Sequence, residues 1–368
     1  MPKYDLNQLL SHQIKQDASD LVLKAYSAPL FRVYGEMYPV KGPDLEPEEV
    51  QELVYSILTD EQKQVFETDM ELDLSYQIPG VSRYRVNIFR QRECVGLAAR
   101  AIPFTLNTIE ELHMPEMVKE FCSRPRGLVL VTGPTGSGKS TSLAAMIRYI
   151  NERFPVHIMT VEDPIEFVHE DKMALVNQRE LHTDTHSFGE ALKHVLRQDP
   201  DVILVGEMRD METIGLAITA AETGHLVFGT LHTTDACQTV DRIIDAFPTH
   251  QQQQIRMQLS VNLVGIISQT LLKRKDGKGR IASYETMIAT SSVRNVIREG
   301  KTYQLPSTIQ TGMKQGMMSL NQNLVLMHLN GWVTEEAALE KATDPIAFAE
   351  ILDESKKKFA EKVGKKPA

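Results

Sequence analysis

The sequence predicts an α/β fold, with a doubly wound, mostly parallel sheet in the C-terminal part and a smaller α+β domain before it. From residue 128 onward, short apolar runs alternate with helical stretches. The runs are continuously apolar, as expected of parallel strands that are covered on both faces. A strand-like stretch in the N-terminal third instead alternates between apolar and polar residues, which is typical of a sheet with one buried face.

The N-terminal elements are predicted in the order helix, two strands, helix and strand. Residues 4–16 are expected to be helical, and residues 20–24 and 30–35 to form strands. A second helix is expected to begin at Pro47, because proline at the first helical position with acidic residues behind it is a start signal. Residues 84–89 alternate and predict a half-buried strand.

The domain boundary is expected near residue 115, which gives domains of residues 1–115 and 116–368. Prolines 103 and 115 mark the connection, residues 108–122 look helical, and the linker is expected over about residues 103–125. The chain ends in a lysine-rich tail, which we interpret as a solvated end, with contact to anionic lipid as the alternative. Its lysines are Lys356, Lys357, Lys358, Lys362, Lys365 and Lys366.

Composition argues against several classes of protein. The 368 residues are 42% hydrophobic and 24% charged, which is ordinary for a soluble globular protein. The net charge of −9 provides no overall positive field, so no nucleic-acid partner is expected. Cys94, Cys122 and Cys237 are widely spaced and predict reduced thiols. No signal peptide is recognised, and no apolar stretch reaches the roughly 20 residues that span a bilayer.

A complete phosphate-binding loop of the form G-x-x-x-x-G-K-[ST] lies between a predicted strand and a predicted helix, as this motif requires. The loop and the residue after it are Gly133, Pro134, Thr135, Gly136, Ser137, Gly138, Lys139, Ser140 and Thr141. Its glycines allow backbone N–H groups to surround a phosphate at a helix N-terminus. We expect Lys139 to reach the β- and γ-phosphates of ATP and the Ser140 hydroxyl to bind Mg²⁺.

Acidic residues follow two predicted strands, at the sheet edge where ligands of open α/β folds bind. Glu162, Asp163 and Glu166 follow the apolar run 158–161, and Glu207 follows the run 202–205. Chemistry on Mg²⁺-ATP requires a carboxylate near the metal and a group that orients the attacking water. For either cluster alone, a solvated loop is an equally good interpretation.

Two histidines bracket a further predicted strand at residues 226–230. His225 stands just before this strand and His232 just after it. Sequence alone leaves a structural and a functional role for them equally open.

These motifs, in this order, closely resemble the secretion-type ATPases, the motors of type IV pili and type II secretion. The resemblance rests on the phosphate loop, on Glu162-Asp-Pro-Ile-Glu-Phe, Val205-Gly-Glu-Met-Arg-Asp, Ala221-Glu-Thr-Gly-His and Gly229-Thr-Leu-His-Thr-Thr. It covers the C-terminal domain and is loose in the N-terminal third. It implies a PAS-like N-terminal domain, a RecA-like ATPase domain and a homo-hexameric ring.

The resemblance also implies roles for single residues. Glu166 would be the catalytic base or water-orienting residue, and Glu207 would be the Walker B acid that holds Mg²⁺, partly through water. His232 would sense the phosphate near a subunit interface. The candidate arginine fingers are Arg83, Arg85, Arg92 and Arg100. An arginine that reaches the γ-phosphate can raise the rate by roughly 10³–10⁵.

Within the family, the chain resembles the pilus retraction ATPases. It lacks the tetracysteine insertion of the assembly ATPases, and residues 292–299 resemble a retraction motif at Arg294, Asn295, Arg298 and Glu299. The resemblance implies a cytoplasmic motor for retraction and twitching motility, peripheral at the inner membrane. Its implied partners are a pilus platform protein and possibly a second retraction ATPase. The alternatives are an accessory retraction ATPase that needs such a partner and a RecA-like DNA translocase, which the net charge disfavours.

Overall fold

The computed structural model describes residues 4–33, 35–102 and 106–364, with side chains up to residue 357. Contacts between residues divide the chain into two compact units, residues 1–105 and 106–368. Each unit has a sheet and a hydrophobic core of its own. The two units are described in turn.

The first unit is an antiparallel sheet with the strand order β3–β2–β1–β6–β5–β4. The strands are β1 (Asp20–Leu23), β2 (Leu30–Val33), β3 (Glu36–Pro39), β4 (Glu71–Ile78), β5 (Ser82–Gln91) and β6 (Cys94–Ile102). The helices are α1 (Leu6–Lys15), α2 (Pro47–Tyr55) and α3 (Asp60–Asp69). Tyr84, Val86 and Ile88 of β5 lie in one core with residues of all three helices. The alternating strand and both predicted helices are therefore confirmed.

The second unit is built on a seven-stranded sheet with the order β13–β12–β7–β11–β10–β8–β9. The strands are β7 (Gly127–Thr132), β8 (His157–Glu162), β9 (Leu175–Glu180), β10 (Val202–Val205), β11 (Leu226–Leu231), β12 (Leu263–Lys273) and β13 (Arg280–Ile288). Every neighbouring pair is parallel except β12 and β13. Four of these strands contain the apolar runs that predicted them.

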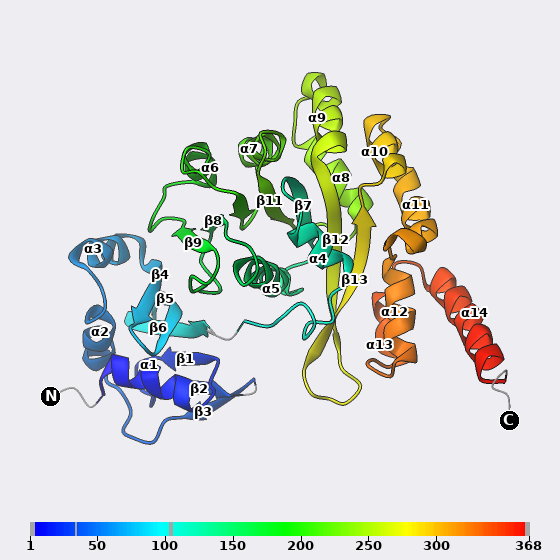
Figure 1. Cartoon of the computed structure of the whole chain (residues 1–368). Coiled ribbons are helices and arrows are strands. Elements are labelled where there is room, and N and C mark those ends of the chain that lie inside the picture. Colours follow the sequence, from blue (N-terminus) through cyan, green and yellow to red (C-terminus); the bar gives the residue numbers. More distant parts are fainter. Residues whose placement is uncertain (1–3, 34, 103–105, 365–368) are drawn as a thin grey trace. The chain divides into compact units, whose positions relative to one another are not determined.

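Helices cover both faces of this sheet, as the continuous apolar runs predict (Figure 1). Leu128 and Leu130 of β7 pack into the core that contains α6 to α9, whereas Val129 and Val131 pack toward α4 and α5. Each such fully buried side chain contributes about 1.5–3 kcal/mol to folding. The helices are α4 (Met117–Cys122), α5 (Lys139–Asn151), α6 (Phe188–Val195), α7 (Met211–Glu222), α8 (Ala236–Asp245) and α9 (Thr249–Asn262). The doubly wound α/β prediction is confirmed.

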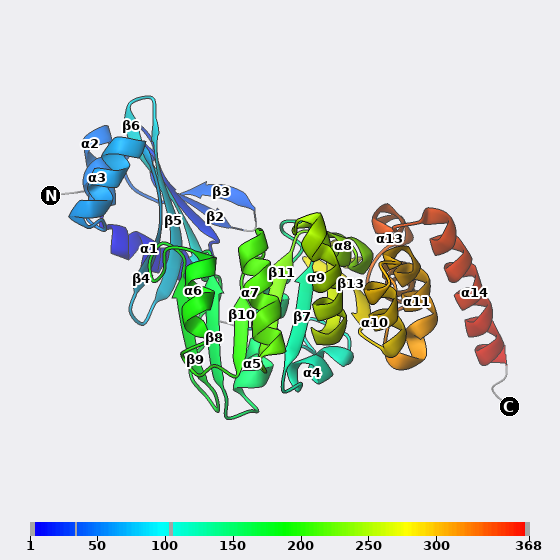
Figure 2. The same ribbon diagram turned by 90° about the horizontal axis from the view of Figure 1, so that it is seen from above.

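The C-terminal helices gather beside β13 (Figure 2). They are α10 (Ser291–Arg298), η1 (Thr302–Gln304), α11 (Leu305–Thr311), η2 (Gly312–Gln315), α12 (Leu320–Leu329), α13 (Glu335–Lys341) and α14 (Pro345–Gly364). Leu272 of β12 and Ile281 of β13 share a small core with α12, α13 and α14. Within the described residues, no helix combines the length and the apolarity that crossing a membrane requires.

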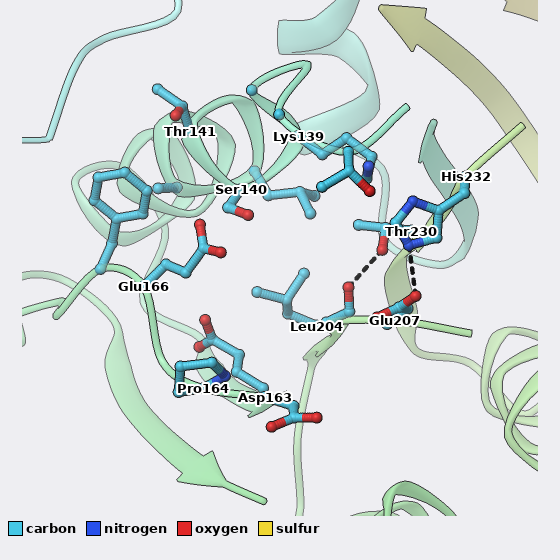
Figure 3. A pocket seen from close by; sticks show the side chains of 18 of the residues that line it. Lys139, Ser140, Thr141, Asp163, Pro164, Glu166, Leu204, Glu207, Thr230 and His232 are labelled. Carbon is cyan, nitrogen blue, oxygen red and sulfur yellow. Dashed lines mark hydrogen bonds and ion pairs between the residues drawn. The ribbon is translucent and has the colours of Figure 1, made fainter. Parts of the chain in front are cut away.

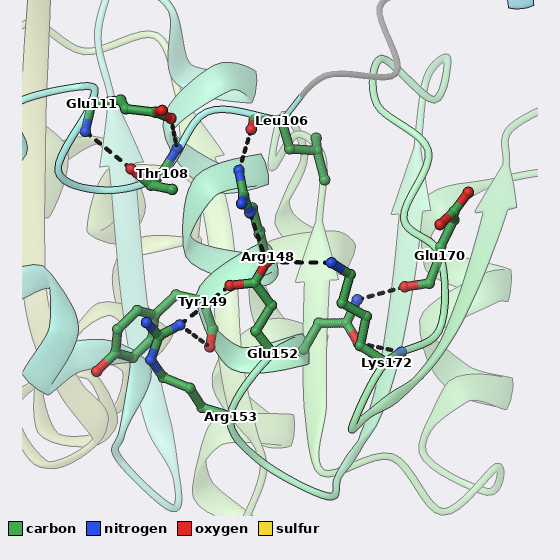
Figure 4. A network of polar contacts seen from close by, with 10 residues as sticks. Leu106, Thr108, Glu111, Arg148, Tyr149, Glu152, Arg153, Glu170 and Lys172 are labelled. Carbon is green, nitrogen blue, oxygen red and sulfur yellow. Dashed lines mark hydrogen bonds and ion pairs between the residues drawn. The ribbon is translucent and has the colours of Figure 1, made fainter.

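The second unit begins earlier than the boundary expected near residue 115. Ile109 and Met114 are buried in the core beneath α4 and α5. Arg148 of α5 donates a hydrogen bond to the carbonyl oxygen of Leu106 and, through Nε, one of 2.8 Å to Glu152 Oε1 (Figure 4). Residues 106–115 are therefore anchored to α5.

The helix expected over residues 108–122 is largely wrong. Only α4 is helical, and residues 109–113 form turns. Pro115 explains the late start, because a proline disfavours helical backbone at the residue before it. Of the expected linker, residues 103–105 lie outside the described residues, and much of the rest packs into the second unit.

All three cysteines are free thiols, as expected. Burial raises the pKa of the Cys122 thiol above its usual range, and burial, followed by the nearby Asp241 and Asp235, raises that of Cys237 to about 11. Both thiols therefore stay protonated at neutral pH and are poor nucleophiles.

Candidate nucleotide-binding site

The predicted loop, acids and His232 meet at one edge of the large sheet. β7, β11, β10 and β8 are neighbours in this order, and the carboxyl ends of parallel strands share one edge. The loop follows β7, His232 follows β11, Glu207 lies just beyond β10, and Glu162 ends β8. These groups line one pocket of about 340 Å³, which lies wholly within the second unit (Figure 3).

Eleven of the predicted site residues line this pocket. They are Thr135, Gly136, Gly138, Lys139, Ser140, Thr141, Glu162, Asp163, Glu166, Glu207 and His232. Gly133, Pro134 and Ser137 belong to the same loop but shape its backbone rather than the pocket wall. The sequence therefore identified the phosphate loop and the acidic residues that line the pocket.

The loop backbone has the conformation that its glycines predict. Gly133, Gly136 and Gly138 have φ angles of 145°, 76° and 89°, in the region that side chains disfavour. A Cβ atom on Gly133 would lie 2.3 Å from the carbonyl oxygen of Gln269. The Gln269 side chain in turn donates a 2.7 Å hydrogen bond to the Ser137 carbonyl. The loop is thus held against β12, and α5 begins directly at Lys139.

The Lys139 ammonium lies within the loop itself. Its Nζ donates hydrogen bonds to the carbonyl oxygens of Gly133 (2.7 Å) and Pro134 (3.2 Å). Burial lowers the pKa of Lys139, while the charges of Glu207 and Glu166 oppose this shift. A phosphate in the pocket would offer this ammonium stronger, charged acceptors than the two carbonyls.

Glu207 lies among hydrogen-bond donors. Its Oε1 is 2.6 Å from His232 Nε2 (Figure 3) and 2.5 Å from Arg209 Nε. Burial raises the pKa of Glu207, but the bonds from Arg209 and His232 outweigh burial and hold it below the usual value. Glu207 is therefore ionised at neutral pH, as a metal-binding carboxylate must be.

Glu162 and Glu166 lie on the other side of the pocket. Glu162 Oε1 accepts hydrogen bonds from Thr160 Oγ1 (2.6 Å) and Gln178 Nε2 (3.0 Å). Burial raises the pKa of Glu162 to about 6, although these two bonds oppose the shift. Figure 3 shows the Glu166 carboxylate pointing into the pocket from the segment after β8.

His225 does not join this group. It precedes β11, whereas His232 follows it, so the two side chains lie at opposite ends of the strand. The His225 Nδ1 atom is 2.9 Å from the carbonyl oxygen of Ala220, at the end of α7. In this unit, His225 has a structural contact and no place in the pocket wall.

The four candidate arginine fingers belong to the first unit. Arg83 and Arg85 lie on β5, Arg100 lies on β6, and Arg92 lies in the turn between these strands. Arg100 Nε is 2.8 Å from Asp20 Oδ1. Their approach to a phosphate stays a prediction.

The motif at residues 292–299 forms α10 and contains one clearly structural residue. Arg294 donates hydrogen bonds to the carbonyl oxygens of Ala289 (2.8 Å), Ser260 (2.7 Å), Val261 and Leu263 (2.9 Å). It therefore satisfies carbonyl groups that the end of α9 leaves free. Asn295, Arg298 and Glu299 are exposed, and Asn295 bonds to both Arg298 (2.7 Å) and Glu299 (3.0 Å).

Sequence reasoning missed His169, Leu271 and Arg280, which also line the pocket. Leu271 and Arg280 come from the β12–β13 hairpin, and the Asp276-Gly277 pair in its loop is a hairpin signal that could have located them. Burial lowers the pKa of His169 to about 4, so this pocket residue is neutral. No sequence signal distinguished His169 from other histidines.

Comparisons with known proteins agree with this geometry. The family model "Type II/IV secretion system protein" matches residues 3–339. The type IV pilus retraction ATPase PilT of Pseudomonas aeruginosa is 53% identical over 344 residues, which cover 94% of this chain and 100% of PilT. The type IV pilus ATPase PilU of the same organism is 40% identical over 338 residues, covering 92% of this chain and 88% of PilU.

A crystal structure of the pilus retraction motor PilT with bound ADP has the same fold. It superimposes with a TM-score of 0.88 at 46% identity, covering 94% of this chain and 98% of that one. A glycine-rich phosphate loop with its lysine, and an ionised acid near it, are the kinds of group with which P-loop enzymes bind and hydrolyse nucleoside triphosphates. The chain therefore belongs to the type II/IV secretion system protein family, and it is an ATPase.

Proposed function

We propose that this chain is the motor of type IV pilus retraction and works as a ring of six copies. The observation that supports this most is the likeness to PilT, which spans both units rather than the ATPase unit alone. The identity with PilU is lower over a similar length, which favours the motor over an accessory ATPase.

ATP would bind with its phosphates on the loop and its γ-phosphate toward the acids. The N–H groups at the start of α5 and the Lys139 ammonium would neutralise the phosphates, with Lys139 leaving the Gly133 and Pro134 carbonyls. The loop geometry is already formed, so little backbone rearrangement would be needed on binding.

The donor set of the pocket fits Mg²⁺, which prefers oxygen ligands. Ser140 and the ionised Glu207 both line the pocket, and these residues would hold the ion, Glu207 partly through water. When bound, the ion supplies positive charge that offsets the charge developing on the phosphates.

Glu166 would orient the attacking water or accept its proton, because its carboxylate points into the pocket beside Ser140. His232 would report the state of the γ-phosphate through its bond to Glu207. Arginines of the N-terminal unit, from the set Arg83, Arg85, Arg92 and Arg100, would complete the charge stabilisation. Differential contact of these arginines with ATP and ADP would convert hydrolysis into motion.

The motor would act in the cytoplasm, peripheral at the inner membrane, on a pilus platform protein. Closure around the ring would turn the platform and draw pilin subunits out of the filament. The exposed Asn295, Arg298 and Glu299 of α10 are the candidate residues for coupling hydrolysis to retraction.

Complementation tests this proposal. In a strain without its own retraction and accessory ATPases, the chain alone should restore pilus retraction and twitching motility. The Glu207→Gln variant, expressed at the same level, should not. If the chain restores retraction only together with a second ATPase, it is an accessory ATPase and the proposal is wrong.

A further inference from the structure

The segment that carries Glu166 is held in place from β9. Residues 163–169 connect β8 to the chain leading into β9, and Asp163, Pro164, Glu166, Phe167 and His169 of this segment all line the pocket. It has no regular secondary structure, so its backbone shape depends on hydrogen bonds from neighbouring elements. Two side chains of β9, Gln178 and Glu180, supply these bonds.

Gln178 makes three hydrogen bonds, two to this segment and one to Glu162 at the end of β8. Its Oε1 accepts from the His169 N–H (2.8 Å), and its Nε2 donates to the Phe167 carbonyl oxygen (2.8 Å) and to Glu162 Oε1 (3.0 Å). A backbone N–H only donates and a carbonyl oxygen only accepts, so these partners fix which end of the amide faces which group. Only an amide side chain of this length can accept a hydrogen bond from the His169 N–H and also donate to both the Phe167 carbonyl oxygen and Glu162.

Glu180 lies two residues further along β9 and therefore points to the same side of the strand. It is 3% exposed, and its Oε2 accepts a 2.9 Å hydrogen bond from the Ile165 N–H. The backbone groups that Glu180 and Gln178 hold by these bonds include the Ile165 N–H and the Phe167 carbonyl oxygen, and these residues are the two neighbours of Glu166. The position of Glu166 is thus fixed from both sides by β9, although neither β9 residue lines the pocket.

We propose that Gln178 is a positioning residue for ATP hydrolysis, holding Glu162 and the Glu166 segment in the geometry that the reaction needs. This inference rests on the proposed role of Glu166 in hydrolysis, but not on the proposed role of the chain in pilus retraction. Nucleotide binding depends on the loop and on α5, which Gln178 does not contact through any of these bonds. Loss of Gln178 should therefore slow turnover while leaving nucleotide affinity nearly unchanged.

The test compares Gln178→Glu with Asn177→Asp in the full-length chain. Both variants change an amide to a carboxylate on adjacent residues of β9, but Asn177 is exposed and bonds to His157 (2.8 Å). Gln178→Glu removes both donors and places a carboxylate against Glu162 and the Phe167 carbonyl. We expect kcat to fall by about 10- to 100-fold with the Kd for ADP within about threefold of the unmodified chain. Asn177→Asp should change neither value.

A second variant separates positioning from charge repulsion and covers a failure of the first to fold. Gln178→Met has a similar length and no charge, and it should lower kcat by a comparable factor. The inference is wrong if either variant that folds keeps kcat close to that of Asn177→Asp. It is also wrong if the affinity for ADP falls as far as kcat, since Gln178 would then support the whole pocket.

Glu166→Gln serves as the reference for the proposed function. If Glu166→Gln keeps full turnover, the proposed role of Glu166 is wrong, and the positioning role fails with it. If Glu166→Gln stops turnover while the Gln178 variants do not, only the inference about Gln178 is overturned.

Discussion

Single residues of the pocket were predictable where a motif fixes both type and spacing. The loop, Glu162, Glu166, Glu207 and His232 were located by their positions after apolar strands. The residues that hold these side chains in place were not predictable, because partners such as Gln178 are distant in sequence or carry no recognisable signal. Their effect depends on side-chain contacts, which periodicity does not encode.

Glu285 is a buried acid that the sequence did not single out. It lies on β13, is 9% exposed, and its Oε1 accepts a 2.9 Å hydrogen bond from the N–H of Ala236, the first residue of α8. Burial raises the pKa of Glu285 from 4.5 to about 7, although the Ala236 bond opposes the shift. The folded chain therefore keeps a proton on Glu285 that the unfolded chain releases between about pH 4.5 and 7.

This shift predicts a stability loss as pH rises. Because the unfolded state binds fewer protons in that window, Glu285 lowers the free energy of unfolding between about pH 4.5 and 7, by on the order of 3 kcal/mol. Glu285→Gln keeps an oxygen for the Ala236 N–H and cannot ionise. Its melting temperature should fall less than that of the unmodified chain between pH 5 and pH 8. If the melting temperatures of the two proteins fall by the same amount between pH 5 and pH 8, the prediction for Glu285 is wrong.

At the scale of elements, continuous apolar runs predicted four central strands, and a proline start signal predicted α2. β9 and the β12–β13 hairpin were not predicted. β9 is an edge strand whose last four residues, Asn177-Gln-Arg-Glu, are polar, and its role comes from the groups to which it hydrogen-bonds. The helix expected at residues 108–122 failed because the effect of Pro115 outweighed local helix propensity.

The end of α9 depends on a residue of α10. Arg294 bonds four carbonyl oxygens, so Arg294→Ala should lower the free energy of unfolding by about 2–4 kcal/mol. Arg294→Lys should recover little, because an ammonium lacks the planar fork that reaches several carbonyls. Arg298→Ala, an exposed change on the same helix, is the control and should stay within about 0.5 kcal/mol. Equal denaturation midpoints for the two alanine variants would contradict this account.

At the scale of the whole molecule, the two-unit organisation was predictable, but the start of the second unit was not. In residues 106–115, Ile109 and Met114 are buried in the second core, and Arg148 donates a hydrogen bond to the carbonyl oxygen of Leu106. The division therefore depends on tertiary contacts rather than on a change in composition.

The exposed part of α10 should separate hydrolysis from mechanical work. Arg298 bonds only within α10 among the contacts described, and it lies outside the nucleotide pocket. Arg298→Ala should keep ATP turnover within about twofold and abolish pilus retraction, since chemistry would proceed without coupling. Labelled pili and a phosphate-release assay on the same variant measure both activities. Normal retraction by this variant would show that Arg298 of α10 does not couple hydrolysis to retraction.

The arginines of the N-terminal unit are expected to act on the reaction and not on folding. Among Arg83→Ala, Arg85→Ala, Arg92→Ala and Arg100→Ala, at least one should lower kcat by about 10³-fold or more with ADP affinity retained. Arg90→Ala is the matched control on β5, because Arg90 pairs with Glu67 at 2.6 Å and is not a candidate. If none of the candidate variants has a kcat below that of the Arg90→Ala control, these candidates do not supply an arginine finger.

Steady-state ATP turnover by Lys139→Ala and Glu207→Gln tests the central claim most directly, namely that this pocket hydrolyses ATP. Both residues line the pocket, but Lys139 begins α5 after β7 and Glu207 follows β10, so a shared loss cannot come from one local distortion. We predict that both variants lose turnover by about 10³-fold or more, with Glu207→Gln still binding ADP. Substantial turnover in both variants would contradict the assignment of the site.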